Sequence, residues 1–265
     1  MVTTVHVARP SALPTLLRTL TSVYEHTVGR FILGASREVI AVSEAVGEHA
    51  RHLGAPADCV SVIRNGVDHE RYFPLDTDNP SSSRPLVVFV GRLISNKGPE
   101  LLLEALATSK ARLDADVVFL GDGPLRYQLQ REARNRGLGE QVRFQGHSSD
   151  IAAWLRRADV LVRPSFTEGL PLALLEALAS RVCVVASDIP GNADLIRHGE
   201  SGLLFKAGDA RALADALQRV LADPAARGMM AANGWQTSLG YSWDVCADAV
   251  GKVLMRGASR GARDG

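Results

Sequence analysis

The chain of 265 residues carries 30 Lys and Arg against 29 Asp and Glu, and 46% of its residues are hydrophobic. This apolar fraction with a net charge of +1 excludes a largely disordered chain and argues against a polyanion as the main partner. The length suits one large domain plus part of another. Because no apolar run reaches the ~18 residues that span a bilayer and no signal segment follows Met1, the sequence predicts a soluble, cytoplasmic protein.

Residues 1–75 are expected to contain three strands and two helices. In chain order, we expect a strand VTTVHV at 2–7, a helix at 13–28, a strand VIAVS at 39–43, a helix from Glu44 and a strand SVIR at 61–64. Three strands make a thin sheet with a small core. We therefore interpret 1–75 as part of an N-terminal, Rossmann-like domain.

A stretch rich in Pro, Ser and Asp, FPLDTDNPSSSRP, separates this region from the rest of the chain. Such a composition without apolar periodicity is typical of a flexible connection, and we take residues 76–85 as the linker.

From residue 86 onward, short β-branched runs alternate with amphipathic stretches of helical length. The expected strands are 86–90, 117–120, 142–145, 160–163, 182–186 and 203–206. Apolar strands joined by helical crossovers indicate a parallel sheet covered on both faces. The sequence therefore predicts a doubly wound, Rossmann-like domain at 86–225, followed at 226–265 by a helical segment whose end, GASRGARDG, is expected to fray.

The three cysteines Cys59, Cys183 and Cys246 lie far apart, without a CxxC or Cys/His cluster. This spacing predicts neither a disulfide framework nor a zinc site. Buried free thiols are the expectation.

The segment SFTEGLPLALLEALAS places Glu168 and Glu176 eight residues apart behind the strand VLVR. Gly169 and Pro171 mark the turn, so Glu168 is expected in the loop and Glu176 on the following helix. Loops at the carboxyl ends of parallel strands bind ligands, and free N–H groups near Leu170 can receive an anion. A carboxylate farther along the helix can accept two ribose hydroxyl groups. The alternative is a pair of solvent-exposed glutamates.

A second loop, GRLISNKG, is bounded by glycines and carries Arg92 and Lys97. An arginine fork beside a lysine point charge suits the oxygens of a diphosphate. A further turn, GDGP at 121–124, could approach a nucleotide closely through its glycines, although Asp-Gly is also an ordinary turn signal. Solvated loop charges are the alternative interpretation of Arg92 and Lys97.

Taken in order, these segments resemble the retaining glycosyltransferases of the large GT-B family 4. The family's GR…KG loop, GDGP-like turn, FxG strand end and EGxPxxxxEA segment correspond here to Arg92 with Lys97, 121–124, Phe144 with Gly146, and 168–177. The resemblance also covers VIAVSEAV, VIRNGVD and YSWDVCADAV. It implies an α/β fold of GT-B type, with one complete Rossmann-like domain and a partial N-terminal one.

The resemblance also implies roles for single residues. Arg92 and Lys97 would bind the donor diphosphate, Glu176 the ribose, and Glu168 with adjacent amides the transferred sugar. His6 matches a histidine that faces this sugar from the N-terminal domain. The donor site would further include Gly121, Gly146, His147, Gly169, Leu170 and Pro171.

Two features depart from the family pattern. Arg181 and Cys183 stand where the family commonly has Gly and Pro after the EA helix. A complete relative also carries several further βα units before the VTTVH strand, including a Gly-rich loop, so the first part of the N-terminal domain is expected to be absent from this sequence.

The resemblance implies retaining transfer of a hexose from a UDP- or GDP-sugar to a hydroxyl acceptor on a glycan, lipid or small molecule, without a cofactor. Glycosyltransferases of a different fold hold a metal with DxD carboxylates, and these letters occur at 76–78 and 114–116. We interpret the first as linker and the second as a turn, and predict metal-independent transfer.

The sequence leaves two other functions open. A truncated, non-catalytic nucleotide-sugar binding protein is the main alternative, and a sugar-nucleotide epimerase is a third. A dehydrogenase is disfavoured because no GxGxxG follows a strand.

Basic residues in two stretches of the sequence bear on further kinds of partner. The arginines at 126–136 are typical of a solvated helix face, which gives nucleic-acid binding little support. The apolar stretch with Arg18 and Arg30 would allow peripheral membrane contact if the acceptor is a lipid, with core packing as the alternative.

Overall fold

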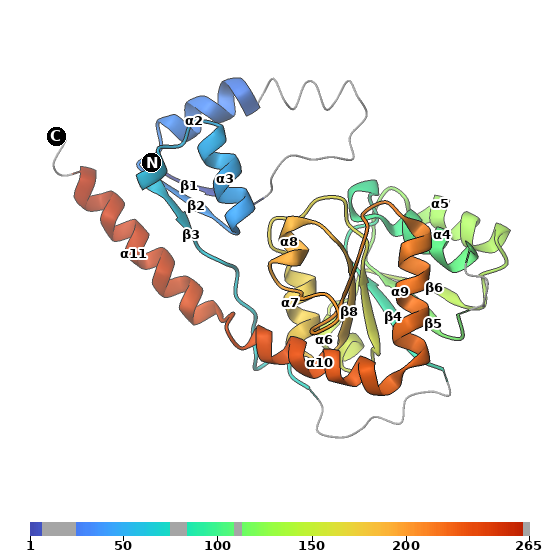
Figure 1. Cartoon of the computed structure of the whole chain (residues 1–265). Coiled ribbons are helices and arrows are strands. Elements are labelled where there is room, and N and C mark those ends of the chain that lie inside the picture. The colour runs from blue at the N-terminus through green and yellow to red at the C-terminus, as the bar shows by residue number, and fades with distance from the viewer. Residues whose placement is uncertain (7–24, 75–83, 109–112, 262–265) are drawn as a thin grey trace.

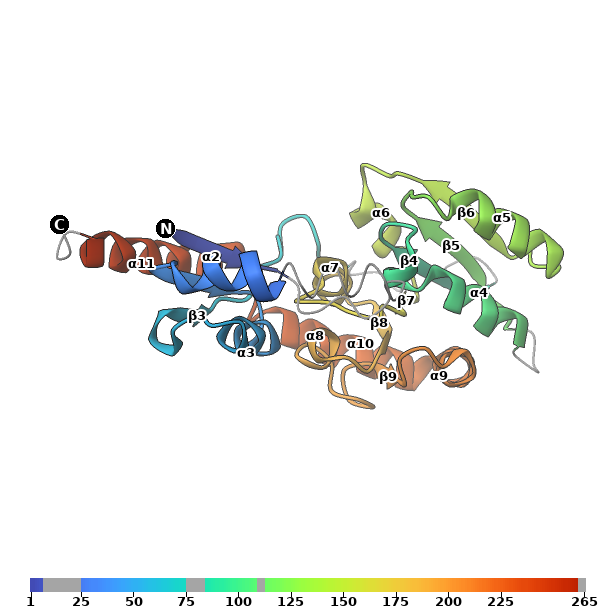
Figure 2. The same cartoon turned by 90° about the horizontal axis from the view of Figure 1, so that it is seen from above.

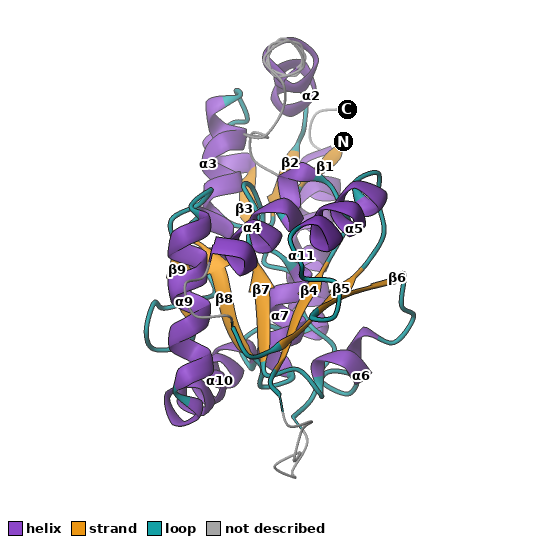
Figure 3. Ribbon diagram, turned by 90° about the vertical axis from the view of Figure 1, so that its right-hand side faces the viewer, coloured by secondary structure: helices purple, strands orange, loops and turns teal. Residues whose placement is uncertain are grey.

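The computed structural model describes residues 1–6, 25–74, 84–108 and 113–261, and it contains two α/β units of unequal size (Figure 1). The smaller unit is a three-stranded parallel sheet in the order β1-β2-β3. The larger is a six-stranded parallel sheet in the order β6-β5-β4-β7-β8-β9, visible edge to edge in Figure 3. The α/β class with parallel sheets is therefore confirmed.

All the strands expected from the sequence are present, and several end a little earlier than expected. Their bounds are β1 Val2–Val5, β2 Glu38–Ala41, β3 Val60–Val62, β4 Leu86–Val90, β5 Asp116–Leu120, β6 Val142–Gly146, β7 Val160–Arg163, β8 Cys183–Ser187 and β9 Leu203–Phe205.

Helices connect the strands, as the amphipathic stretches predicted. The α-helices are α2 Arg30–Gly34, α3 Glu44–His52, α4 Pro99–Thr108, α5 Arg126–Asn135, α6 Ile151–Leu155, α7 Leu172–Ala179, α8 Pro190–Ala193, α9 Ala210–Ala222, α10 Pro224–Ser238 and α11 Trp243–Gly261. Short helical turns of other types are η1 Glu25–Gly29, η2 Ala57–Cys59 and η3 Ser95–Lys97. Most of the helix expected at 13–28 lies outside the described residues.

The six-stranded sheet separates two apolar cores. Alternate residues of a strand point to opposite faces, so Val87 and Phe89 of β4 pack with α4, α5 and α9, while Val88 and Val90 pack with α6 and α7. Because helices cover both faces, the central strands are buried along their whole length.

The two C-terminal helices belong to different units, which differs from the expected separate segment at 226–265. Helix α10 packs against α7, α9 and β8, so its contacts assign it to the larger unit (Figure 2). Helix α11 instead packs on β2, where Val253 meets Ile40 and Ile63 (Figure 1). Residues 257–261, which were expected to fray, form the end of α11, since this helix continues to Gly261.

The smaller unit touches the larger one through a shared apolar cluster. Ala41, Val42 and Val46 of the smaller unit lie in the same buried cluster as Leu170 and Leu174. Near the second crossing of the chain between units, Val67 N–H donates to the carbonyl of Tyr241, with 3.2 Å between nitrogen and oxygen. The two units are therefore held together by packing as well as by covalent connection.

The structure joins none of the three cysteines, all of which it describes, in a disulfide, and they are not equally buried. Cys59 and Cys183 are buried, whereas Cys246 on α11 is half-buried. Burial raises the pKa of Cys183 to about 12.

The turn after α7 contains Arg181, one of the two residues that depart from the family pattern. It adopts a left-handed conformation with φ 56°. Its N–H donates to Leu178 and the N–H of Val182 donates to Ala177, which is the Schellman arrangement. A side chain at this position costs about 1 kcal/mol relative to glycine. We expect Arg181→Gly to raise the free energy of unfolding in urea by roughly 0.5–1 kcal/mol.

Arg181→Ala is the control for this prediction. Alanine removes the exposed guanidinium but keeps the strained backbone, so a change within about 0.5 kcal/mol is expected. Equal stabilisation by both variants would assign the effect to the arginine side chain and contradict the backbone explanation.

Candidate active site

The candidate site lies at the centre of the larger sheet, where strands β4 and β7 run side by side. The helix after β4 packs on one face of the sheet and the helix after β7 on the other. Ligands of open α/β sheets bind at such a point, outside the carboxyl ends of the strands. The two segments singled out in the sequence, GRLISNKG and SFTEGLP, are the loops that follow these two strands.

Hydrogen bonds join the two loops directly. Phe166 N–H donates to the carbonyl of Asn96 at 2.9 Å, and Asn96 Nδ2 donates to the carbonyl of Thr167 at 3.4 Å. Gly98 has φ +65°, and a Cβ built there would lie 2.1 Å from the carbonyl oxygen of Pro164. Only glycine allows the loops to approach so closely.

Lys97 and Glu168, one from each loop, form an ion pair. Lys97 Nζ lies 2.9 Å from Oε1 and 2.8 Å from Oε2 of Glu168. A second cation, Arg163 at the end of β7, reaches the same carboxylate, with its Nη2 2.5 Å from Oε1. The side chain of Glu168 is only 7% exposed, so the structure contradicts the solvent-exposed alternative for this glutamate.

Charge and burial act against each other in this cluster. Burial alone would raise the pKa of Glu168, but the charges of Arg163 and Lys97 hold it below its ordinary value. Burial and the charge of Arg163 lower the pKa of Lys97, although Glu168 opposes them. The carboxylate is therefore ionised at neutral pH, and the three charges form one coupled unit.

Arg92 differs from Lys97 in its surroundings. It is exposed, and no carboxylate pairs with it in the part of the chain that the structure describes. Its charge nevertheless contributes to lowering the pKa of Lys97, which places the two cations in electrostatic contact. Of the two cations in this loop, Lys97 is therefore paired with Glu168, whereas Arg92 is exposed and accessible to a ligand.

Glu176 lies on α7, as expected, and is half-buried. Its carboxylate accepts a hydrogen bond from the hydroxyl of Tyr72, which reaches it from the segment after β3. Burial raises the pKa of Glu176, whereas Tyr72 and the charge of Arg71 oppose the rise. Burial and the neighbouring Glu176 raise the pKa of Tyr72 to about 12.

The GDGP turn closes one side of the site. Gly121 N–H donates to the carbonyl of Gly146 at 2.8 Å, and a Cβ at Gly121 would lie 2.0 Å from the carbonyl oxygen of Gly91. His147 follows β6 and is exposed. In the GDGP turn, hydrogen bonds from the Gly123 N–H and from Arg126 lower the pKa of Asp122. The loop after β4, the GDGP turn after β5 and the end of β6 therefore meet at the carboxyl ends of these strands.

The smaller unit meets the loop after β7 at Gly169. A Cβ at Gly169 would lie 1.8 Å from the carbonyl oxygen of His6, which directly follows β1. Asn65 Nδ2 also donates to the carbonyl of Leu170 at 3.1 Å. The structure thus brings His6 to the loop of Glu168 through its backbone, and Pro171 follows there as the residue before α7. The roles assigned to these residues stay predictions.

Sequence reasoning missed two members of the site. Arg163 was part of the expected strand VLVR, and its one signal was a charge at the end of an otherwise apolar strand. Tyr72 gave no signal, because nothing in its neighbourhood indicates that it reaches Glu176. Tyr72 reaches Glu176 from a distant segment, whereas Arg163 lies five residues before Glu168 and depends on a distant segment only for its contact with Val90.

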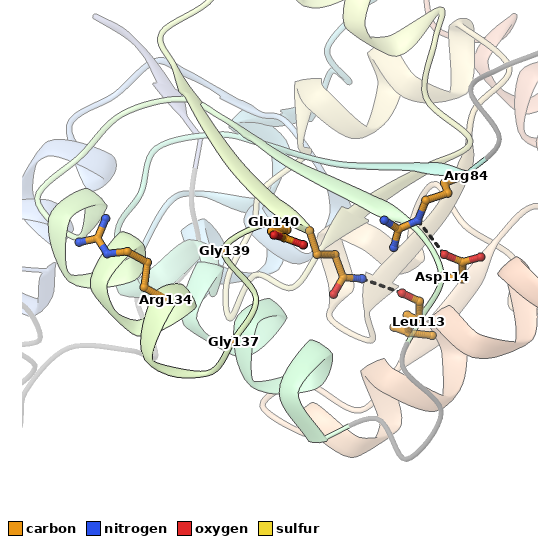
Figure 4. A pocket seen from close by; sticks show the side chains of 8 residues that line it. Arg84, Leu113, Asp114, Arg134, Gly137, Gly139 and Glu140 are labelled. Carbon is orange, nitrogen blue, oxygen red and sulfur yellow. Dashed lines mark hydrogen bonds and ion pairs between the residues drawn. The ribbon is translucent and has the colours of Figure 1, made fainter.

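A hollow of about 810 Å³ lies elsewhere, at the loops that precede β4, β5 and β6 (Figure 4). Arg84 and Asp114 line it and form an ion pair with 2.6 Å between nitrogen and oxygen. Asp116 pairs with Arg84 and with Arg143. These loops stand at the amino ends of the strands, opposite the candidate site.

One of the two DxD sequences, at 114–116, lies in the part of the chain that the structure describes. Asp114 and Asp116 are engaged by arginines, and the described residues contain no group of three or more His, Cys, Asp or Glu suited to a metal ion. Residues 76–78 lie outside the described part of the chain. Among the helices that the structure describes, none is both long and apolar enough to cross a membrane.

Comparison with known proteins gives consistent family matches. A profile of the family described as "Glycosyl transferases group 1" matches residues 76–237, and one described as "Glycosyltransferase Family 4" matches residues 1–71. The chain is 33% identical over 240 residues to a D-inositol 3-phosphate glycosyltransferase of Frankia alni, covering 83% of this chain and 58% of the relative. The chain therefore spans less than two thirds of that relative's length.

Solved structures show the same fold. A sucrose-phosphate synthase from Thermosynechococcus elongatus matches with a TM-score of 0.85 and 27% identity, covering 96% of this chain and 67% of that one. Anabaena HepE in complex with UDP-glucose matches with a TM-score of 0.85 and 23% identity, covering 96% and 72%. These matches confirm the GT-B type of fold.

Proposed function

This chain belongs to the glycosyl transferases group 1 family, and from that membership we propose that it transfers a hexose from a nucleoside diphosphate sugar to a hydroxyl acceptor. The proposal includes retention at the anomeric carbon, a UDP- or GDP-sugar as donor, and activity in the cytoplasm without a cofactor or metal ion. The match covers only 58% of the length of the Frankia relative, so the activity of a complete protein is itself part of the proposal.

The observation that carries the proposal is the junction of the two loops at the β4 and β7 strand ends. Lys97 and Glu168 meet there within 2.9 Å, and the exposed Arg92 stands in the same loop as Lys97. Two cations beside a buried carboxylate suit a donor that presents both a diphosphate and sugar hydroxyl groups. The UDP-glucose bound to Anabaena HepE is a ligand of this chemistry.

In the proposed reaction, Arg92 and Lys97 bind the diphosphate and stabilise the negative charge that grows on it as the glycosidic bond breaks. Electrostatic stabilisation of this kind is worth about 3–4 kcal/mol per well-placed donor. Glu168, with the amides of Gly169 and Leu170, holds the sugar that is transferred. His6 faces this sugar from the smaller unit, and no covalent nucleophile takes part.

The remaining residues position the nucleotide. Glu176 accepts hydrogen bonds from the ribose, replacing or sharing the bond that it receives from Tyr72. The positions that complete the donor site are Gly121, Gly146, His147 and Pro171.

A transfer assay tests the proposal. The chain is incubated with radiolabelled UDP-glucose or GDP-mannose and hydroxyl acceptors, among them D-inositol 3-phosphate, and products are separated by chromatography. Appearance of a glycosylated acceptor with an unchanged anomeric configuration, also in EDTA, is the expected result. Binding of UDP or GDP without transfer would support the non-catalytic alternative, and conversion of the donor sugar to its epimer would support the third.

Glu176→Gln is expected to weaken UDP binding about tenfold, because a carboxylate accepts stronger hydrogen bonds from ribose than an amide does. Inorganic pyrophosphate lacks the ribose, so its affinity is expected to stay within about twofold of the unaltered chain. Isothermal titration calorimetry measures both. Equal loss for the two ligands would contradict ribose binding by Glu176.

Tyr72→Phe is the matched variant for this measurement. It removes the hydroxyl that shares the Glu176 carboxylate but keeps the ring that packs in the apolar cluster. UDP binding equal to or tighter than that of the unaltered chain is expected.

A further inference from the structure

Arg163 is a buried cation at the centre of the larger sheet. Its side chain is only 6% exposed, although it ends a strand that is otherwise apolar. A buried arginine requires partners for its donor groups. The structure supplies them: Nη1 donates to the carbonyl of Val90 at 2.6 Å, and Nε donates to Glu168 Oε1 at 2.9 Å.

The surroundings of Arg163 fix its position. Val90 is the last residue of β4, so the guanidinium bridges the ends of the two central strands. A Cβ at the neighbouring Gly91 would lie 2.8 Å from Nη1, so glycine there leaves space for the guanidinium. Arg163 is therefore held by β4 at one end and by Glu168 at the other.

The two cations use the Glu168 carboxylate differently. Both Nε and Nη2 of Arg163 donate to Oε1, whereas Lys97 Nζ reaches Oε1 and also Oε2 at 2.8 Å. The side chain of Lys97 is 21% exposed, against 6% for Arg163. Lys97 is thus the cation that can turn toward a ligand, while Arg163 stays in place.

We propose that Arg163 is a positioning residue, which holds the Glu168 carboxylate in place and charge-paired when Lys97 leaves it to bind the donor diphosphate. This inference rests on the proposed function, since it assigns Lys97 to the diphosphate. Glu168 then keeps one cationic partner, and Oε2 becomes available to a hydroxyl group of the sugar.

The physical reason is the cost of an unpaired buried charge. Removing one partner of a buried ion pair is strongly unfavourable, because the remaining charge has lost its solvation and its counter-ion. Without Arg163, release of Lys97 would leave Glu168 in that state, so Lys97 would stay bound to Glu168. The diphosphate would then lose one of its two cations.

Calorimetric titration of the chain with UDP and with GDP tests this inference. Whichever nucleotide binds the unaltered chain is expected to bind Arg163→Met at least about tenfold more weakly, because the Lys97 contact is lost. Arg163→Lys keeps the charge without the fork and is expected to weaken it by about threefold. Arg143→Met, which removes an exposed arginine of β6, is the matched control and is expected to leave affinity unchanged.

A double-mutant cycle shows whether Arg163 acts through Glu168. In a Glu168→Gln background, Lys97 has no carboxylate to leave, so adding Arg163→Met is expected to change affinity by less than about twofold. The double variant removes both buried charges together. If Arg163→Met alone does not fold, the double variant can still be compared with Glu168→Gln. A loss of affinity equal to that in the original background would overturn the inference, as would unchanged affinity in Arg163→Met.

A second readout does not require a bound nucleotide. The chain has four lysines, so the 13Cε NMR signal of Lys97 can be assigned by its disappearance in Lys97→Arg. The charge of Arg163 lowers the pKa of Lys97, and Arg163→Met is therefore expected to raise it. An unchanged pKa would overturn the shared ion pair. If the unaltered chain binds neither UDP nor GDP, the proposed function fails, while this signal still shows whether the charge of Arg163 acts on Lys97.

Discussion

Lys97→Ala is expected to weaken binding of UDP or GDP by about 10- to 100-fold, the value of a charge-assisted hydrogen bond to a phosphate oxygen. Turnover is expected to fall at least as much, because the charge on the leaving diphosphate grows in the transition state. The fold is expected to persist, since Arg163 still pairs with Glu168 after Lys97 is removed. Titration calorimetry and the transfer assay measure the two effects.

Lys206→Ala is the matched control for Lys97→Ala. Lys206 is exposed and follows β9, at the same edge of the sheet, but it lies outside the loops after β4 and β7. The net charge changes equally in both variants, so an equal loss of affinity would reduce the role of Lys97 to a general electrostatic effect. Unchanged affinity in Lys97→Ala would contradict the assignment of the diphosphate to this residue.

Gly98→Ala is expected to lower the free energy of unfolding by roughly 2–4 kcal/mol, a large part of the stability of a typical domain. About 1 kcal/mol comes from the left-handed backbone at φ +65°. The rest comes from the contact between the new Cβ and the carbonyl of Pro164, 2.1 Å away before any shift. Relief of that contact would separate the two loops, so UDP binding is expected to weaken as well. Urea denaturation and titration measure these losses.

Gly137→Ala provides the comparison for Gly98→Ala. Gly137 has a similar φ of +70°, but a Cβ there would meet nothing within 4 Å. It is expected to cost about 1 kcal/mol and to leave UDP binding unchanged. The difference between the two variants isolates the contact between loops, and equal costs would show that this contact is unimportant.

Much of the larger unit could be predicted because its signals are local. A run such as LVVFV, which is rich in valine and bounded by Pro85 and Gly91, is typical of a central strand, and the helix that follows has apolar residues at helical spacing. The positions of Lys97 and Glu168 in loops also followed from local signals, namely the flanking glycines and Pro171. These patterns need no knowledge of distant residues.

Expectations failed where the outcome depends on distant segments. The end of the chain, GASRGARDG, was expected to fray because it is a terminus, whereas α11 continues to Gly261. Packing against β2 stabilises this helix, and a helix owes most of its stability to such packing rather than to its own composition. Packing against distant segments also explains why α10 belongs to the larger unit and α11 to the smaller one.

The sequence by itself determined the strand and helix order, the glycine-bounded loops and the family resemblance, because each is written in neighbouring residues or in their spacing. Only the tertiary structure decided that Arg163 shares Glu168 with Lys97, and that Tyr72 reaches Glu176 from the other unit. A charge can be read from the sequence, but its partner and its burial depend on which strands become neighbours. At this site they were set by the side-by-side placement of β4 and β7.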